Sequence, residues 1–302
     1  MKVLIAVDDD PIFEDVLSTL RWCVRLSPAD AAIILHGTRY PWMRWVTESD
    51  EAFKSWTRAD DENGEKLLGK ARQRLASWGI SVETLRAGGQ PAEEILRAAV
   101  ERQVDLIVVG ALGWQHRGFL VGSVTQKVES LAETDVLIVR RGAPLTDDPM
   151  RAILAVDGSP ESLAGVRSFA EKFQAKNAEI TVVQVLDLPP LSAWEMIQPD
   201  RPIDIARLDA PLRGQVDAAI EKAMDILRSH GIEAKSEVWK GRPADEILAA
   251  ADRHRAHLVV VGSRGLSGIR GLLLGSVARR VVSHGITSVL VARTPRADAG
   301  AR

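Results

Sequence analysis

The stretch of sequence that decides the fold runs from Leu258 to Ser276 and reads LVVVGSRGLSGIRGLLLGS. Its first four residues are apolar and mostly β-branched, which is typical of a strand buried on both faces of a parallel sheet. Glycines follow, and the sequence after Ser276 reads as a helix. A buried strand that opens into glycines and ends at a helix start exposes backbone N–H groups and the positive end of a helix dipole. This arrangement suits a phosphate group.

The glycines have the spacing Gly262-x2-Gly265-x9-Gly275-Ser276. The spacing differs from the Walker pattern because no lysine precedes Ser276, and from the dinucleotide pattern because the first two glycines are too far apart. Arg264 lies between the first two glycines. It is either a cation that approaches a phosphate or a solvated loop arginine, and the sequence leaves both interpretations open.

Composition limits the classes of function. The chain has 302 residues, enough for two ordinary domains, and its net charge of −2 gives no general attraction to nucleic acid or to a membrane surface. No apolar run approaches the roughly 20 residues that span a bilayer, and we expect no targeting segment before the first strand. The single cysteine, Cys23, excludes an internal disulfide and suits a reducing compartment. We therefore expect a cytoplasmic protein.

The second half of the chain repeats the first. The matching segments are Val3 to Pro11 with Ala152 to Pro160, Gly89 to Leu96 with Gly241 to Leu248, Leu106 to Gly110 with Leu258 to Gly262, and Gly122-Ser123 with Gly275-Ser276. Such self-similarity indicates a duplication. We expect a seam near Arg141 to Met150, with one repeat over residues 1–143 and the other over residues 149–295.

Within each half, short apolar strands alternate with amphipathic helices. The first half predicts strands at 2–8, 31–37, 81–86, 105–110 and 135–140 and helices near 11–26, 51–78, 91–102 and 123–132. The second half predicts strands at 151–157, 179–186, 232–239, 257–262 and 287–293 and helices near 160–174, 209–229, 243–254 and 276–284. This alternation predicts an α/β fold in which each repeat is an open five-stranded parallel sheet, Rossmann-like, with helices on both faces.

Two turns far apart in sequence are predicted to face one crevice. Asp157 ends the first strand of the second half, and Gly262 ends the fourth. In a doubly wound sheet these two strands are neighbours at the switch point, and ligands bind at their carboxyl ends. Ser159-Pro160, directly after Asp157, has the pattern of a helix N-cap followed by proline.

The glycine spacing, together with its strand and helix context, resembles the nucleotide-binding loop of the universal stress protein family, in the branch that binds ATP. The resemblance implies an adenine nucleotide alpha hydrolase-like fold, with ATP as ligand and a magnesium ion accompanying its phosphates. It also implies that the aspartate lies beside the adenosine and that the glycine loop holds the ribose and phosphates. The nucleotide-binding residues implied in this way are Asp157, Val185, Gly262, Gly265, Gly275, Ser276 and Val277, and Arg264 is added as a candidate because it lies between the first two glycines.

The same resemblance implies how the repeats assemble. Members of the family pair through their last strands, which here are Asp135 to Arg140 and Thr287 to Arg293. We therefore expect the two repeats to pair within one chain, and two chains to associate further as a homodimer.

The first half departs from the ATP-binding pattern. Eight residues, one fewer than in the second half, separate its second loop glycine from Gly122, and Asp9-Asp10 replaces the pair Gly158-Ser159. Carboxylates repel a phosphate-bearing ligand. We expect the second repeat to bind ATP and the first to bind it more weakly, differently or not at all. The weaker candidates in the first repeat are Asp8, Gly110, Gly113, Gly122 and Ser123.

Three functional classes remain to be weighed. The leading hypothesis is an ATP-binding regulatory or stress-response module, and the alternative is a slow magnesium-dependent ATPase, although no residue stands out as a dedicated catalytic base. A phosphoacceptor receiver built on Asp8-Asp9-Asp10 would need a further aspartate after the third strand, where Leu85-Arg86-Ala87 has none. We nominate no catalytic residue.

Other features predict no specific chemistry. The histidines His254 and His257 are expected to be structural, and no metal site is predicted. The aromatic cluster of Tyr40, Trp42, Trp45 and Trp56 covers the sheet or forms a lid or partner surface, and both readings stay open. The proline-rich segment at residues 188–211 is expected to be a flap over the pocket.

Overall fold

The computed structural model describes residues 1–8, 12–38, 51–111, 121–140, 149–187, 205–265 and 274–294. Asp9-Asp10, Gly113, the aromatic residues at positions 40–45 and most of the expected flap lie outside these ranges. The architecture is α/β, as the alternating pattern predicted.

The first repeat contains five strands and four helices among the described residues. They are β1 (Lys2–Val7), α1 (Ile12–Cys23), β2 (Ala31–Thr38), α2 (Glu51–Ala76), β3 (Ser81–Gly88), α3 (Pro91–Glu101), β4 (Leu106–Gly110), α4 (Ser123–Leu131) and β5 (Asp135–Val139). Every predicted strand and helix of this half is present, and its ends differ from the predicted positions by at most three residues.

The second repeat follows the same order. It contains β6 (Arg151–Ala155), α5 (Pro160–Lys172), the short helix η2 (Ala175–Asn177), β7 (Glu179–Leu186), α7 (Ile205–Ser229), β8 (Lys235–Lys240), α8 (Pro243–Arg253), β9 (Leu258–Gly262), α9 (Ser276–His284) and β10 (Ser288–Ala292). Among the described helices, none is both long enough and apolar enough to cross a membrane.

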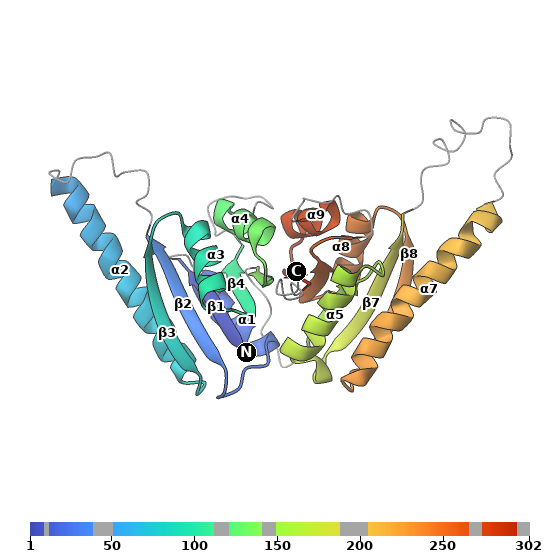
Figure 1. The fold of residues 1–302 in the computed structure, drawn as a ribbon, viewed down its shortest axis with the longest axis horizontal. Coiled ribbons are helices and arrows are strands. Elements are labelled where there is room, and N and C mark those ends of the chain that lie inside the picture. The colour runs from blue at the N-terminus through green and yellow to red at the C-terminus, as the bar shows by residue number, and fades with distance from the viewer. Residues whose placement is uncertain are drawn as a thin grey trace, which may run out of the picture.

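The ten strands form one continuous sheet in the order β3-β2-β1-β4-β5-β10-β9-β6-β7-β8. Pairing is parallel within each repeat, as predicted, and β5 and β10 pair antiparallel at the centre, with Val289 opposite Ile138 and Val291 opposite Val136. The expected pairing of the repeats through their last strands is therefore confirmed. Figure 1 shows the two repeats side by side, with α2 and α7 on the outer flanks.

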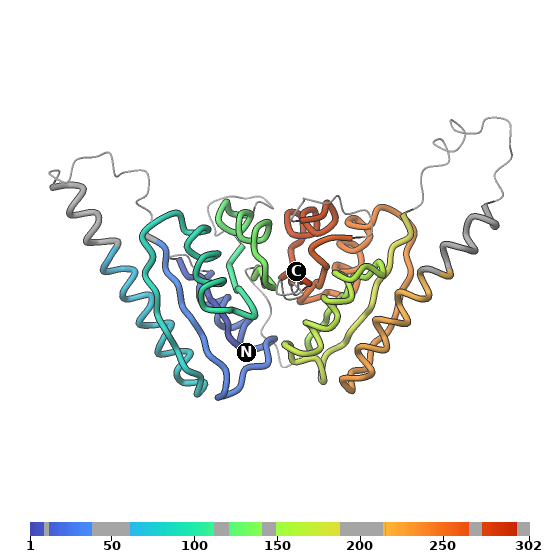
Figure 2. The backbone as a smooth tube through the Cα atoms, viewed as in Figure 1, coloured from blue at the N-terminus to red at the C-terminus, as the bar shows by residue number. Residues whose placement is uncertain are grey.

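Helices cover both faces of the sheet, and each face has its own core. Helices α1, α2, α5 and α7 contribute to one buried cluster, and α3, α4, α8 and α9 contribute to the other. Both clusters run through the two repeats without interruption at the central strands, and Figure 2 shows how closely the backbone paths of the two repeats correspond. Cys23 is 1% exposed on α1, and burial raises the pKa of its thiol to about 12.

A reciprocal pair of arginines joins the repeats beside the central strands. Arg140 follows β5, and its guanidinium donates a hydrogen bond to the carbonyl of Val282 on α9. Arg293 follows β10, and its guanidinium donates to the carbonyl of Glu129 on α4. Each repeat thus places a positive charge at the last turn of a helix in the other repeat, where the helix dipole favours a cation.

A second contact between the repeats ends two helices earlier than the sequence predicted. The helices predicted at 11–26 and 160–174 end earlier because Val24 and Phe173 form an antiparallel bridge with each other. The N–H of Arg25 donates to the Lys172 carbonyl at 2.8 Å, and the N–H of Gln174 donates to the Cys23 carbonyl at 2.8 Å. Hydrogen bonds across the junction replace those that would have continued each helix.

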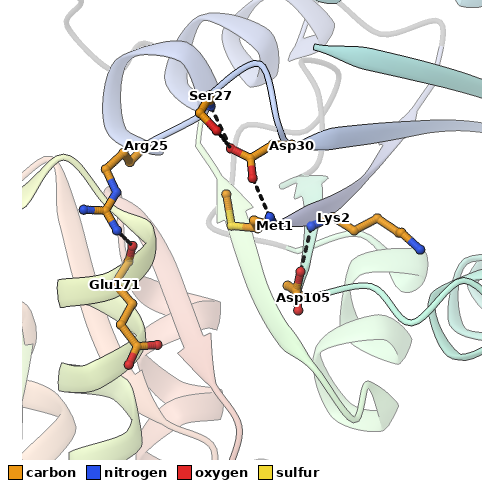
Figure 3. Close-up of polar contacts among 7 residues, drawn as sticks. All are labelled: Met1, Lys2, Arg25, Ser27, Asp30, Asp105 and Glu171. Carbon is orange, nitrogen blue, oxygen red and sulfur yellow. Dashed lines mark hydrogen bonds and ion pairs between the residues drawn. The ribbon is translucent and has the colours of Figure 1, made fainter.

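The Arg25 side chain adds to this contact. Figure 3 shows it extending from the end of α1 to the backbone carbonyl of Glu171 on α5 of the other repeat. Beside it, the Asp30 carboxylate accepts hydrogen bonds from the amino group of Met1 and from the Ser27 backbone, the latter at 2.7 Å, which ties down the start of β1. The repeats are therefore joined both by the central strands and by the ends of α1 and α5.

Glu129 is a buried acid at the junction. It is 2% exposed, and its Oε2 atom has no hydrogen-bond partner among the described residues. Burial raises the pKa of Glu129 to about 7, although the nearby charges of Arg279, Arg293 and Arg140 act to lower it. This carboxyl group titrates near neutral pH in the folded protein, far above the value of about 4.3 usual for glutamate.

Replacing Glu129 by glutamine should change how stability depends on pH. Between about pH 4.5 and pH 7 the folded chain keeps a proton on Glu129 that the unfolded chain has released, so through this group rising pH lowers the free energy of unfolding. In urea titrations, we expect E129Q to gain stability relative to the wild type as the pH rises from about 5 to about 7.5. E62Q, at an exposed site on α2, is the control and should show no such trend. If the difference in the free energy of unfolding between E129Q and the wild type does not change with pH, the raised pKa of Glu129 is contradicted.

Two glycines allow α5 to lie directly on β9. A Cβ atom at Gly165 would lie 3.3 Å from Val260 Cγ1, and a Cβ atom at Gly262 would lie 2.7 Å from both the carbonyl carbon of Glu161 and the N atom of Ser162. The neighbours of Gly262 are backbone atoms, which cannot rotate away as a side chain can. The helix start and the strand end are therefore packed as closely as glycine permits.

Gly262→Ala should destabilise the fold, because α5 must move away from β9 to admit the methyl group. We expect the free energy of unfolding to fall by about 1–3 kcal/mol, measured by urea denaturation. Gly69→Ala on α2 is the matched control, since a Cβ atom there meets nothing within 4 Å and alanine favours the helix. Equal free energies of unfolding for G262A and the wild type would show that the start of α5 moves away from β9 at little cost.

Candidate functional site

The second repeat contains a cleft of about 800 Å³ at the carboxyl ends of β6, β7 and β9. All the residues predicted for a nucleotide site in this repeat line it, namely Asp157, Val185, Gly262, Arg264, Gly265, Gly275, Ser276 and Val277. They come from four separate parts of the chain. The sheet order brings them together because β6 and β9 are hydrogen-bonded neighbours.

Asp157 lies in the tight turn between β6 and α5. Its Oδ1 atom accepts hydrogen bonds from the Ser159 N–H at 2.9 Å and from the Ser159 hydroxyl at 2.5 Å. Ser159 Oγ in turn accepts from the Ser162 N–H at 3.2 Å and caps α5, as the Ser-Pro pattern predicted. Gly158 has a φ of +84°, a conformation that glycine adopts without strain, so the turn needs this residue. The carboxylate is held in one orientation at the edge of the cleft.

The glycine loop touches this turn. A Cβ atom at Gly265 would lie 2.5 Å from Asp157 Oδ2, so a side chain at position 265 would collide with the carboxylate. At the other end of the loop, the Gly275 N–H donates to the Ser263 carbonyl at 2.7 Å, and the Ser263 N–H donates to the Ala292 carbonyl at 2.9 Å. These bonds hold the two ends of the loop together. Residues 266–273, between them, are not described.

Helix α9 points its N-terminus at the cleft. Gly275 is its N-cap, with extended backbone and no side-chain cap, and Ser276 and Val277 in the first turn line the cleft. The N–H groups of a first helical turn have no partner within the helix and carry the positive end of its dipole. The chemical consequence is a site that favours an anion, and a phosphate most of all.

Charged side chains surround the cleft in nearly balanced numbers. Arg264 Nε lies 3.5 Å from Glu161 Oε1, and Arg280 Nη2 lies 2.7 Å from Asp245 Oδ1. Arg242, at the N-cap of α8, is exposed and also lines the cleft. Sequence reasoning missed Arg242 and Arg280, although Arg280 follows Ser276 by four residues and this spacing places both on one helix face.

The inner end of the cleft is mostly apolar and contains one buried amide. Val156, Val183 and Val216 line it, and Gln184, next to Val183 in β7, is 7% exposed. The Gln184 Oε1 atom has no hydrogen-bond partner among the described residues. A buried polar atom without a partner is costly, and a ligand that supplies one relieves that cost. Sequence reasoning missed Gln184 too; the signal was a polar residue inside an otherwise apolar strand.

The first repeat has different side chains at the position that corresponds to the cleft of the second repeat. Asp8 follows β1, Gly110 ends β4, and Gly122 and Ser123 begin α4, so four of its five candidates keep the expected positions, whereas Gly113 is not described. A Cβ atom at Gly110 would lie 2.8 Å from Ile12 Cγ2, a buried side chain. Counting from Pro11 and Pro160, Ile12 corresponds to Glu161 of the second repeat. An aliphatic side chain therefore stands where the second repeat has the carboxylate that pairs with Arg264.

Histidines and acids form no metal centre among the residues that the structure describes. The Nε2 atom of His254 lies 3.0 Å from Glu237 Oε1, and the Nδ1 atom of His257 accepts the Arg151 N–H at 3.0 Å. Both histidines thus hold neighbouring strands and helices in place. Trp56 lies on α2, where only the backbone is described, so its proposed role in an aromatic cluster is untested.

Comparisons of the sequence with a family model and with known proteins all match one family. The family model described as the universal stress protein family matches residues 1–140 and again residues 150–293. Universal stress protein MJ0531 of Methanocaldococcus jannaschii is 30% identical over 167 residues, which are 53% of this chain and 90% of that protein. Universal stress protein Rv1996 of Mycobacterium tuberculosis is 32% identical over 210 residues, which are 66% of this chain and 62% of that protein.

A solved structure supports the fold over the whole chain. The crystal structure of a universal stress protein from Archaeoglobus fulgidus matches with a TM-score of 0.64 at 19% identity and covers 97% of this chain and 98% of that chain. At this identity the likeness concerns the fold alone. Since the family model matches almost every residue in two consecutive copies, the chain belongs to the universal stress protein family as a tandem of two of its domains.

Proposed function

We propose that this chain is an ATP-binding universal stress protein that acts as a nucleotide-dependent regulatory or stress-response module, with its site in the second repeat. The observation that carries the proposal is the convergence of the glycine loop, the α9 N-terminus and Asp157 on one cleft of about 800 Å³. A cleft of this volume has room for a ligand the size of a nucleotide. The repeats are proposed to comprise residues 1–143 and 149–295.

The parts of the cleft fit the parts of ATP. In this proposal the free N–H groups at the start of α9 receive the phosphates, with Arg264 as a cation beside them. The valines at the inner end form an apolar slot for the base, and Asp157 lies between base and phosphates, within reach of the ribose. A magnesium ion bound to the phosphates would reduce their charge near Asp157.

The location and assembly of the protein are part of the same proposal. A free buried cysteine suits a reducing compartment, so we expect the protein to act in the cytoplasm. We also propose that two chains associate as a homodimer.

Two carboxylates of the cleft favour binding over hydrolysis, whereas a third, Asp187, is exposed on its lining. Asp157 accepts two hydrogen bonds from Ser159, and Asp245 pairs with Arg280. A carboxylate that is already engaged is a poor base for an attacking water. Phosphate release over many turnovers, at rates usual for dedicated enzymes and abolished by a Gly275 variant, would favour the ATPase alternative instead.

Loop variants of the two repeats test which repeat binds nucleotide. Gly275→Val places a branched side chain at the mouth of the cleft, and Gly122→Val is the matched change in the first repeat. We expect G275V to weaken ATP binding at least about tenfold in isothermal titration calorimetry, while G122V stays within about twofold of the wild type. Thermal unfolding checks that both variants fold. A larger loss in G122V than in G275V would overturn the assignment of the site.

A variant of Gln184 tests how the base is recognised. If the buried amide bonds to the edge of the base, Gln184→Leu should reduce the preference for ATP over GTP by about tenfold and leave the affinity for inorganic triphosphate unchanged. Thr181→Val is the control, a polar to apolar change at a buried site of the same strand outside the cleft. If Q184L keeps the wild-type preference for ATP over GTP, groups other than Gln184 recognise the base.

A further inference from the structure

A second cleft lies at the other end of the strands, between α1 and α2 of the first repeat and Gln174 of the second. Its volume is about 600 Å³, and its described lining consists of Ser18, Arg21, Trp22, Arg74, Ser77, Trp78 and Gln174. The arginines lie in the last turns of α1 and α2. Helices of an α/β unit run against their strands, so these helix ends lie at the amino ends of the strands, away from the nucleotide cleft. The cleft is therefore a separate site.

Two positive charges in this cleft lack carboxylate partners. Neither the Arg21 nor the Arg74 guanidinium forms an ion pair with any carboxylate in the described ranges, and no acidic residue is among the described lining residues. Arg21 instead lies over the indole of Trp78, with its Cζ atom 5.5 Å from the ring centroid. This cation–π contact holds Arg21 in place while its N–H groups remain available to an anion.

The walls of the cleft are aromatic and firmly held. Trp22 meets His257 of the second repeat edge to face, with ring centroids 4.9 Å apart. The Gln174 side chain, also from the second repeat, donates hydrogen bonds to the carbonyls of Arg21 and Val24 at 3.2 and 3.4 Å. The junction between the repeats thus fixes the end of α1, and Trp22 with it. A preformed wall lowers the entropy lost when a ligand binds.

The composition of this cleft does not follow from the fold. Counting from the matched prolines and glycines, the second repeat has Arg167, Ala170 and Glu171 in place of Ser18, Arg21 and Trp22, and Ile226, Ser229 and His230 in place of Arg74, Ser77 and Trp78. The backbone there forms the same helices without any tryptophan. The dipoles at the ends of α1 and α2 account for arginines in general, but they do not account for two indoles beside them.

We propose that the cleft of Ser18, Arg21, Trp22, Arg74, Ser77, Trp78 and Gln174 binds a small organic anion that carries a planar aromatic ring. The guanidiniums of Arg21 and Arg74 receive its carboxylate or sulfonate, and the indoles contact its ring. The hydroxyl of Ser18 remains for orienting it, because the Gln174 amide nitrogen already donates to two backbone carbonyls. This site does not depend on the nucleotide proposal, since it shares no residue with that cleft.

Calorimetric titration of the full chain with 2-naphthoate tests the proposal. We expect one binding site, with affinity lower by at least about tenfold for the neutral ring 2-naphthylmethanol and for the ring-free anion acetate. R74Q removes a charge from an exposed side chain, and W78L removes an indole. Each should weaken 2-naphthoate binding at least about fivefold. Urea unfolding establishes that both variants keep the stability of the wild type.

The matched control removes two positive charges elsewhere on the surface. R167Q/R228Q changes exposed arginines of α5 and α7 in the second repeat and should leave 2-naphthoate binding within about twofold of the wild type. Absence of binding at millimolar 2-naphthoate would overturn the proposal. So would equal affinity for the neutral ring, or an affinity that R74Q and W78L leave unchanged.

Discussion

The antiparallel pairing of β5 with β10 is the interaction on which the rest of the structure depends. Every residue of both strands is buried, and an unpaired edge there would leave backbone N–H and carbonyl groups without partners. Pairing the two edges removes this cost and merges two five-stranded sheets into one of ten strands. Because both repeats belong to one chain, each always has its partner at high effective concentration.

Around this pairing the backbone is nearly symmetric and the side chains are not. Arg140 and Arg293 bond to helix carbonyls in reciprocal fashion, as two copies of one unit would. Glu129, however, corresponds to Val282, and Asp135, which is also buried and accepts a hydrogen bond from the Arg293 N–H, corresponds to Ser288. The duplicated backbone preserves the geometry of assembly, while substitutions give each repeat its own chemistry.

The same divergence explains why the two repeats offer different sites. The second repeat combines Glu161, Arg264 and an uncapped helix start around an open cleft, whereas the first places Ile12 against Gly110 at the equivalent position. The first repeat instead places two tryptophans, and two arginines without a carboxylate partner among the described residues, at the amino ends of the strands. The chain thus has one cleft at the carboxyl ends of its strands and another at their amino ends, and the two share no described lining residue.

The sequence by itself determined the α/β class, the duplication, the neighbouring position of the first and fourth strands of the second repeat, and eight of the residues that line its cleft, from Asp157 to Val277. These features depend on local periodicity and on glycine and proline positions, which act within a few residues of chain. Only the tertiary structure decided that Val24 and Phe173 leave their helices to bond with each other, that the amide oxygen of Gln184 has no hydrogen-bond partner in the described part of the chain, and that Trp22 and Trp78 share a cleft. Those features arise from contacts between segments far apart in the chain, and local sequence patterns do not encode which distant groups will meet.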